Sequence, residues 1–213
     1  MRWDGLRWTL LGRIVFLVLV NSDQDMDSPS MKKSLAAMLK QRDYFGYLIL
    51  WDSRCRLEGF AQIQLSLNDE DYWKCLSFIY TDSKSIYPNR DYWIKLLSSR
   101  RPQREFFMRP EDWDALKALP DTITIHRGFE NKRAKAGISW TTNLEQAKFF
   151  AHYRTRGVKG KAAYIASGVC SKKDVIGFFN NRQENEIVIL PSKVRKVVVT
   201  EQHFTQPPLR EGI

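Results

Sequence analysis

The chain opens with an apolar run that is set apart from the rest. Residues 8–20 read WTLLGRIVFLVLV and follow two arginines, which is the outline of a secretory signal peptide. An arginine inside the run, an acidic residue before it and the lack of a small-x-small cleavage site count against secretion. Two other interpretations stay open: a native start at Met26 or Met31, and a buried strand or helix. Because the run is short for spanning a bilayer, residues 1–30 are a leader of open status and no membrane association is expected.

Residues 31–86 predict an N-terminal extension that is mainly helical. The stretch 31–45 places leucine and methionine side chains on one helix face, with the spacing that a period of 3.6 residues requires. Residues 45–52 and 60–67 are strand-like or buried segments separated by a polar turn. Another helix is expected from about residue 69, capped by the asparagine or aspartate at its start.

The pattern changes in the second half, after two more predicted helices, the later of which carries Pro110 in its first turn. Short runs rich in β-branched residues now dominate, and Asn143 is expected to cap a helix over residues 144–153. The predicted strands cover residues 122–129, 137–142, 162–169, 174–179, 184–191 and 196–200. Together these elements predict an α+β fold in which residues 87–213 form one domain.

The composition is that of a globular protein with a basic surface. Hydrophobic residues make up 43% and charged residues 27% of the 213 residues, which is enough for a core. The formal net charge of +10 favours polyanionic partners such as nucleic acid, an acidic protein or a phosphate-rich ligand, with a merely solvated basic surface as the alternative. Three cysteines without a CxxC pair and three histidines without metal-ligand spacing predict neither a disulfide framework nor a zinc site.

Two polar motifs stand at predicted strand ends. Arg127 offers a planar fork of donors suited to phosphate, and Gly128 beside it lets a ligand approach the backbone. A plain strand-to-turn junction is the alternative for this pair. Ser139 and Thr141 occupy alternate strand positions, so both hydroxyls are expected on one face toward a pocket. The alternative is a polar strand end that leads into a helix cap.

Two further motifs follow toward the C-terminus. Phe178 and Phe179 precede the polar loop 180–183, and are expected to present a ring at a loop tip unless they simply end a strand. Glu184 and Glu186 open an apolar strand and are expected to face the same side, roughly 7 Å apart from the rise of a strand. Paired carboxylates suit acid–base chemistry and the stabilisation of developing positive charge.

In this order the motifs resemble those of the Arg–Ser–Glu class of ADP-ribosyltransferases. The resemblance consists of Arg-Gly on a strand, Ser-x-Thr before a helix of the A-x-F-A kind, an aromatic-bearing loop and Glu-x-Glu on a strand. It covers about residues 120–200, and the Glu-x-Glu step is its most specific part. Arg127 and Ser139 lie only 12 residues apart, which favours a compact member similar to phage or bacterial toxins. The resemblance implies two short packed antiparallel-rich β-sheets that form an NAD cleft, with N-terminal helices.

The resemblance also implies roles for the residues on the NAD side. Arg127 would grip the phosphates and ribose of NAD, and the backbone of Gly128 would contact nicotinamide. Ser139 would orient a carboxylate and the nicotinamide ribose, with Thr141 supporting that strand. Glu186 would be the catalytic glutamate, which stabilises the oxocarbenium-like state as nicotinamide departs. NAD is the expected co-substrate, and no metal is expected because the pyridinium charge already activates the leaving group.

On the acceptor side, the resemblance implies a protein arginine as the first expected acceptor. Glu184 would pair with the arginine, because a carboxylate binds a guanidinium and helps to remove its proton. The loop that follows the aromatic pair would present the acceptor, with Phe178 or Phe179 as the contact ring and Arg182 and Gln183 beside it.

A basic stretch between residues 131 and 161 keeps other acceptors open, because only Glu145 opposes its eight cations. These cations are Lys132, Arg133, Lys135, Lys148, Arg154, Arg156, Lys159 and Lys161. A positive lobe beside an NAD cleft would repel an arginine-rich segment and attract RNA or DNA. The alternatives are therefore an ADP-ribosyltransferase that acts on RNA or DNA bases, and a non-catalytic nucleic-acid-binding protein with this fold.

A free, active enzyme of this kind would harm its own cell. The hypothesis that follows is a toxin, a phage-defence effector or a phage-encoded modifier, neutralised by an antitoxin or immunity protein as its partner. The cysteine usage fits a reducing cytoplasm as its place of action, with secretion as the lesser alternative.

Overall fold

The computed structural model describes residues 26–83, 86–130, 135–155, 162–180 and 184–202. The chain divides into two compact units, Met1–Ser85 and Ile86–Ile213, and each is described by itself. Among the helices in the described ranges, none is both long enough and apolar enough to cross a membrane.

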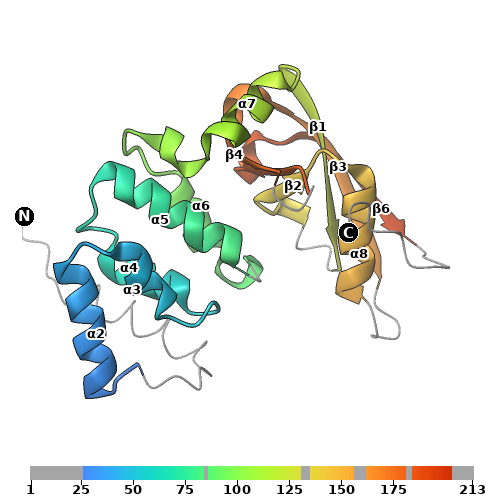
Figure 1. The fold of residues 1–213 in the computed structure, drawn as a ribbon. Helices are drawn as coiled ribbons and strands as arrows, with labels where there is room; N and C mark the ends of the chain where they lie inside the picture. The colour runs from blue at the N-terminus through green and yellow to red at the C-terminus, as the bar shows by residue number, and fades with distance from the viewer. Residues whose placement is uncertain (1–25, 84–85, 131–134, 156–161, 181–183, 203–213) are drawn as a thin grey trace, which may run out of the picture. The chain divides into compact units, whose positions relative to one another are not determined.

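The described residues of the first unit, 26–83, are helical. Their helices are α2 (Pro29–Lys40), α3 (Tyr44–Ile49), α4 (Arg56–Ile63) and α5 (Asp69–Asp82) (Figure 1). Side-chain caps start three of them: Ser28 accepts a hydrogen bond from a backbone N–H of α2, Asp43 from one of α3, and Asn68 from one of α5. Leu48, Phe60, Trp73, Leu76 and Ile79 are fully buried and form the centre of its core.

The strand-like interpretation of residues 45–52 and 60–67 is wrong, because residues 45–49 lie in helix α3, residues 60–63 lie in helix α4, and neither run contains a strand. A short apolar run carries no period that separates a strand from a buried helical turn. The cap at Asp43 decides the first case, since its Oδ1 accepts a hydrogen bond from Gly46 N at 2.8 Å. The prediction that these segments are buried is right in part, with Leu48 and Phe60 wholly inaccessible.

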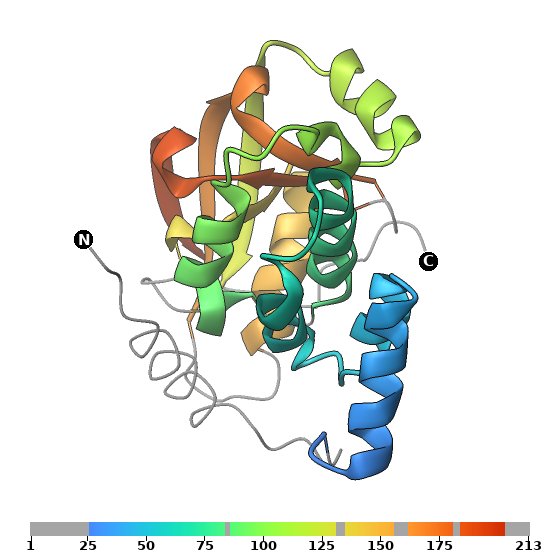
Figure 2. The same cartoon turned by 90° about the vertical axis from the view of Figure 1, so that its left-hand side faces the viewer.

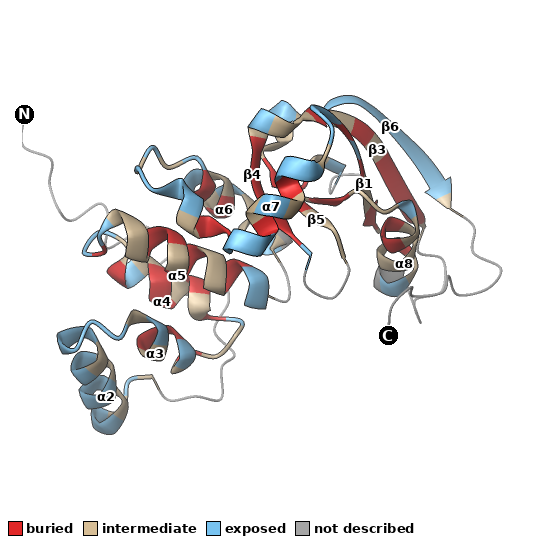
Figure 3. Cartoon of the chain, turned by 45° about the horizontal axis from the view of Figure 1, so that its top comes forward, coloured by how far each residue is buried: buried red, intermediate tan, exposed pale blue. Residues whose placement is uncertain are grey.

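The second unit is α+β, as predicted, and it contains one six-stranded sheet in the order β4-β5-β2-β1-β3-β6. All the strand pairs are antiparallel. The strands are β1 (Thr122–Phe129), β2 (Ser139–Thr141), β3 (Ala163–Ser171), β4 (Val175–Phe179), β5 (Glu186–Ile189) and β6 (Arg195–Gln202). The edge strand β6 is exposed along most of its length (Figure 3).

The expected pair of packed sheets is not present among the described strands. The short strand β2 hydrogen bonds on both sides and so joins β4–β5 to β1–β3–β6 in one sheet. The junction is narrow, because β1 and β2 share the single register pair His126–Thr141, whereas β1 pairs with β3 over its whole length. Among the described strands, that pair is the only register pair between the two halves of the sheet.

Helix α8 (Leu144–Thr155) lies along β1 and β3 (Figure 1 and Figure 2). Asn143 starts it as predicted, with its Oδ1 accepting from Glu145 N at 2.8 Å. Small residues make the approach close: Ala147 and Ala151 are fully buried and cluster with Ala163 and Ile165 of β3.

The remaining helices of this unit are α6 (Arg90–Leu97) and α7 (Pro110–Ala118), with the 3₁₀ turn η2 (Arg104–Phe107) between them. Pro110 stands in the first turn of α7, as predicted. The segment around η2 packs on β4, where the rings of Phe107 and Phe179 meet edge to face at 5.5 Å. This contact positions the strand that borders the candidate site.

Candidate active site

A hydroxyl–carboxylate pair links two neighbouring strands. Ser139 lies on β2 and Glu186 opens β5, and Ser139 Oγ donates a hydrogen bond to Glu186 Oε1 at 2.5 Å. Thr141 and Glu186 are register partners, so Ser139, two residues along β2, shares their face of the sheet. Both members of the pair are half-buried, so the contact is partly shielded from water yet open to a ligand. The two residues that the sequence places 47 positions apart therefore meet.

The side chain of Arg127 binds the main-chain carbonyl group of the same serine. The guanidinium Nη1 donates to the carbonyl oxygen of Ser139 at 2.6 Å, from the end of β1. A Cβ added at Gly137 would lie 2.2 Å from Arg127 Cζ, so a side chain there would displace the guanidinium from this position. Gly137 was not among the predicted site residues, and its only sequence signal is its place just before the Ser-x-Thr strand.

Thr141 fastens the base of the site. It is buried, and its Oγ1 donates to the carbonyl oxygen of Glu184 at 2.7 Å and accepts from Asn143 N at 3.0 Å. One side chain thus ties the segment before β5 to the start of α8. The hydroxyl of Thr141 therefore lies in the protein interior, where it supports the backbone around the site.

The predicted alternation of Glu184 and Glu186 along one strand is wrong. Strand β5 begins at Glu186, and Asn185 has a φ of 46°, in the left-handed region. This single residue breaks the extended backbone, so strand pleating does not set the two carboxylates on one side. The backbone remains anchored here, because Thr142 N donates to Asn185 O at 3.2 Å.

The expectation of an aromatic ring at a loop tip is also wrong. Phe178 and Phe179 both belong to β4 and are buried, with exposed fractions of 3% and 5%. The backbone N–H of Phe178 points to Met108 Sδ at 3.0 Å, while Phe179 is the register partner of Glu186. Both rings therefore belong to the hydrophobic core. The other two predicted acceptor residues, Arg182 and Gln183, lie outside the described residues.

The packing of β1 against α8 explains why residue 128 is a glycine. A Cβ added there would lie 2.0 Å from the carbonyl oxygen of Ala147 and 2.5 Å from Ala151 N. Both are backbone atoms of α8, so a side chain at this position forces the helix away from β1. The predicted contact of its backbone with nicotinamide stays a prediction.

Asp112 is a site neighbour that the sequence reasoning missed. It is a buried carboxylate on α7, with its Oδ2 3.0 Å from Arg109 Nε. Its Oδ1 accepts from Asn180 N at 3.4 Å, just beyond the end of β4. The ion pair with Arg109 also raises the pKa of that guanidinium above its ordinary value. Asp112 thereby fixes the backbone at Asn180, the residue that directly follows β4.

His126 adds a second polar pair on β1. Its Nδ1 lies 2.8 Å from Ser167 Oγ on β3, and the two residues are register partners. Burial lowers the pKa of His126, because the imidazolium is harder to solvate there than the neutral ring. The described residues contain no group of three His, Cys, Asp or Glu side chains that could hold a metal ion.

The basic stretch is seen only in part. Lys148 pairs with Glu145 at 2.5 Å on α8, and Lys135 is exposed. The side chains of Lys132, Arg133, Arg154, Arg156, Lys159 and Lys161 fall outside the described part of the chain.

The candidate site is centred on Ser139 of β2, which contacts the carboxylate of Glu186 on β5 through its hydroxyl and the guanidinium of Arg127 on β1 through its carbonyl oxygen. A scan against models of protein families finds no match for this chain, and searches of curated proteins and of solved structures find none either.

Proposed function

We propose that this protein is an NAD-dependent mono-ADP-ribosyltransferase, which cleaves the nicotinamide–ribose bond and transfers ADP-ribose to a macromolecule. The observation that carries the proposal is the convergence on Ser139, whose hydroxyl holds Glu186 and whose carbonyl holds Arg127. These are the three residue types, in the chain order, of the Arg–Ser–Glu class that the sequence resembles.

The chemistry needs one fixed negative charge. As the bond between C1′ and the pyridinium nitrogen breaks, its electron pair goes to the nitrogen and neutral nicotinamide leaves. Positive charge then develops on the ribose. A carboxylate suits the stabilisation of that charge and a bond to the 2′-hydroxyl, and the hydrogen bond from Ser139 Oγ supports Glu186 in this role. An acceptor nucleophile forms the new bond to C1′ and gives its proton to a base. Arg127 suits the diphosphate, because a guanidinium binds phosphate oxygens in pairs.

A protein arginine is the first candidate acceptor. Glu184 immediately precedes the break at Asn185, and its carbonyl oxygen is held by Thr141, so its backbone is fixed close to Glu186 in the chain. A carboxylate at this position suits an incoming guanidinium and its proton. The ring contact once expected from Phe178 or Phe179 does not enter the proposal, since both rings are buried.

A nucleic-acid base is the second candidate acceptor. The net charge of +10 favours it, as does a cationic pocket in the same unit that is described in the next subsection. The two candidates separate in one experiment. Lysate is incubated with labelled NAD and the protein, then treated with protease or with nuclease. Loss of the label with protease indicates a protein acceptor, and loss with nuclease indicates RNA or DNA.

The same proposal implies a harmful activity in the producing cell. Expression of the wild-type chain is expected to arrest growth, and Glu186→Gln is expected to relieve the arrest at equal protein level. Normal growth with wild-type protein at high level, in the absence of any neutralising partner, would argue against the role of a toxin or phage effector.

A further inference from the structure

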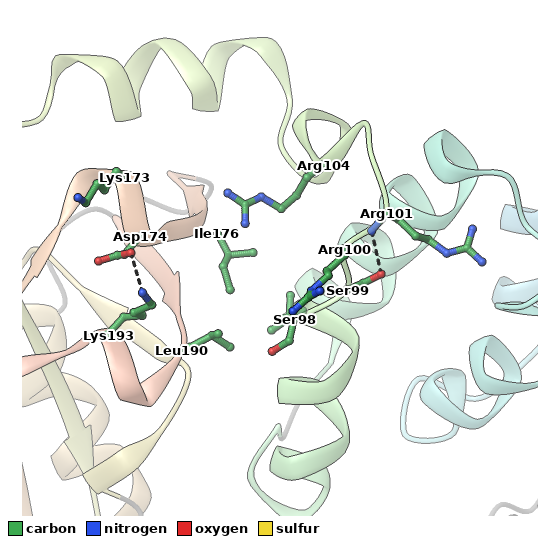
Figure 4. A pocket seen from close by; sticks show the side chains of 11 residues that line it. Ser98, Ser99, Arg100, Arg101, Arg104, Lys173, Asp174, Ile176, Leu190 and Lys193 are labelled. Carbon is green, nitrogen blue, oxygen red and sulfur yellow. Dashed lines mark hydrogen bonds and ion pairs between the residues drawn. The ribbon is translucent and has the colours of Figure 1, made fainter.

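A pocket of about 460 Å³ opens in the second unit, and Ser139 is not among the residues that line it (Figure 4). Cations stand on its rim and aliphatic side chains form its floor. The rim includes Arg100, Arg104, Lys173 and Lys193, and the floor includes Ile176 and Leu190.

The charge on the rim is unbalanced. One carboxylate, that of Asp174, lines the pocket, and it lies 3.3 Å from Lys193 Nζ. Within the described part of the chain, no carboxylate pairs with Arg100, Arg104 or Lys173. In Figure 4, Arg100 and Arg104 extend toward the strand side of the pocket, where Ile176 lies, whereas Arg101 points away. Several cations around one hollow repel each other, and a bound anion relieves that repulsion.

The segments that carry these cations are fixed by packing. Gln103, with a φ of 62°, turns the chain sharply into η2, and the buried Phe107 anchors η2 on β4. On the other side, Lys172 Nζ donates to the carbonyl oxygen of Leu119 at 2.6 Å and so holds the turn that carries Lys173. The rim is therefore built on anchored turns, and an anion meets guanidinium groups already brought together.

The floor narrows the class of ligand. Ile176 is buried at the base, and Leu190 lies half-buried beside it. Apolar surface next to guanidinium groups fits a nucleotide, which carries a sugar and a planar ring next to each phosphate. Acidic peptide side chains offer the charge without the ring. The hollow is large enough for one nucleotide unit and its neighbouring phosphates.

The position of the pocket connects it with the candidate active site. Leu190 follows directly after β5, and Glu186 begins that strand, so the two lie roughly 13 Å apart along the chain from the rise of a strand. The pocket is thus separate from Ser139 and Glu186 but borders the same strands, β4 and β5. A strand of a few nucleotides can reach from one to the other.

We propose that this pocket binds the phosphodiester backbone of a single-stranded nucleic acid. Arg100 and Arg104 contact the phosphates, and the aliphatic floor receives the sugar and base edges. The binding itself does not require NAD. Its use, which is to hold an acceptor strand with a base near Glu186, rests on the proposed function with a nucleic-acid base as the acceptor.

The test measures binding of the full chain, without NAD, to fluorescently labelled single-stranded RNA and DNA of equal length by anisotropy at several salt concentrations. The pocket variant is Arg100→Gln with Arg104→Gln, two exposed positions. The matched control is Lys33→Gln with Lys40→Gln, which removes the same charge from exposed positions of α2. Circular dichroism and thermal unfolding confirm that both variants fold like wild type.

We expect the pocket variant to lose at least about tenfold in affinity and to lower the salt slope by about two, with the control within about twofold of wild type. Equal losses in both variants, or no binding by wild type, would overturn the proposal. So would polyglutamate, free mononucleotide or inorganic phosphate competing as well as the unlabelled oligonucleotide. Glu186→Gln is expected to bind like wild type, so a failure of NAD cleavage and a failure of this site give different results.

Discussion

Ser139 Oγ donates a 2.5 Å hydrogen bond to Glu186 Oε1, from the middle of the sheet to its neighbouring strand. The bond selects one orientation of the carboxylate before any ligand arrives. Since Arg127 holds the carbonyl oxygen of the same serine, a change at residue 139 alters only the hydroxyl arm and leaves the main-chain arm in place. A substitution of Ser139 therefore tests the contribution of the hydroxyl separately from that of the main-chain contact.

Ser139→Ala is expected to reduce nicotinamide release from NAD on the order of 10–100-fold, because the carboxylate of Glu186 loses its fixed orientation. The free energy of unfolding is expected to fall by about 1.5–3 kcal/mol, the contribution of one hydrogen bond to a charged group. Ser192→Ala, at an exposed position, is the control and is expected to retain wild-type activity. Equal activity in the two variants would show that the hydroxyl does not position Glu186.

Gly128→Ala is expected to destabilise the second unit by about 1–3 kcal/mol, because the new methyl group meets backbone atoms of α8. Urea unfolding measures the effect. Gly168→Ala is the matched control: its added Cβ would lie 3.0 Å from its nearest neighbours, against 2.0 Å at Gly128. A smaller loss at residue 128 than at residue 168 would contradict the packing argument.

His126 is expected to make stability depend on pH. Burial depresses its folded pKa below the ordinary value of 6.5, so the unfolded chain binds a proton more readily than the folded one. This contribution is fully present above pH 6.5 and is lost as the pH falls toward the folded pKa. Urea unfolding from pH ~8 to pH ~5 is expected to show a decline that His126→Gln makes shallower. An equal decline in both proteins would contradict it.

The two innermost cysteines are expected to resist thiol reagents in the folded protein. Burial raises the pKa of the Cys75 thiol to about 12 and that of Cys170 to about 11, and neither is accessible. Ellman's reagent at pH ~8 is expected to label them only after denaturant is added, because the thiolate is the reactive form. Rapid labelling of either residue in native protein, located by peptide mapping, would show that its surroundings open readily.

The second half of the chain was predictable to the extent that its periodicity is local. Residues 122–129 begin with four β-branched residues and form β1 with those bounds. Asn143 caps α8 as expected, because the cap is a contact over three residues. The break at Asn185 was not predictable, since its left-handed backbone is held by pairing with the distant Thr142. That one residue shortens β5 and separates Glu184 from it.

The candidate site, like the fold, was predictable from the sequence only in part. The order of Arg127, Ser139 and Glu186 indicated a shared site, but only the fold reveals that Ser139 contacts both of the others, with its carbonyl oxygen accepting from Arg127 and its hydroxyl donating to Glu186. The sequence predicted that one of the two phenylalanines of β4 lies at a loop tip, whereas both are buried. Nothing in the local sequence distinguishes a core phenylalanine from an exposed one. The cationic pocket gives no sequence motif at all, since its rim comes from separate turns.

The most direct test of the central claim follows nicotinamide release from NAD by purified wild-type protein and by Glu186→Gln, each with and without cell lysate. We predict release by wild type, a loss on the order of 10²–10³ in the variant, and ADP-ribose on a macromolecule in the lysate arm. Equal inertness of both proteins, correctly folded and supplied with lysate, would contradict the account.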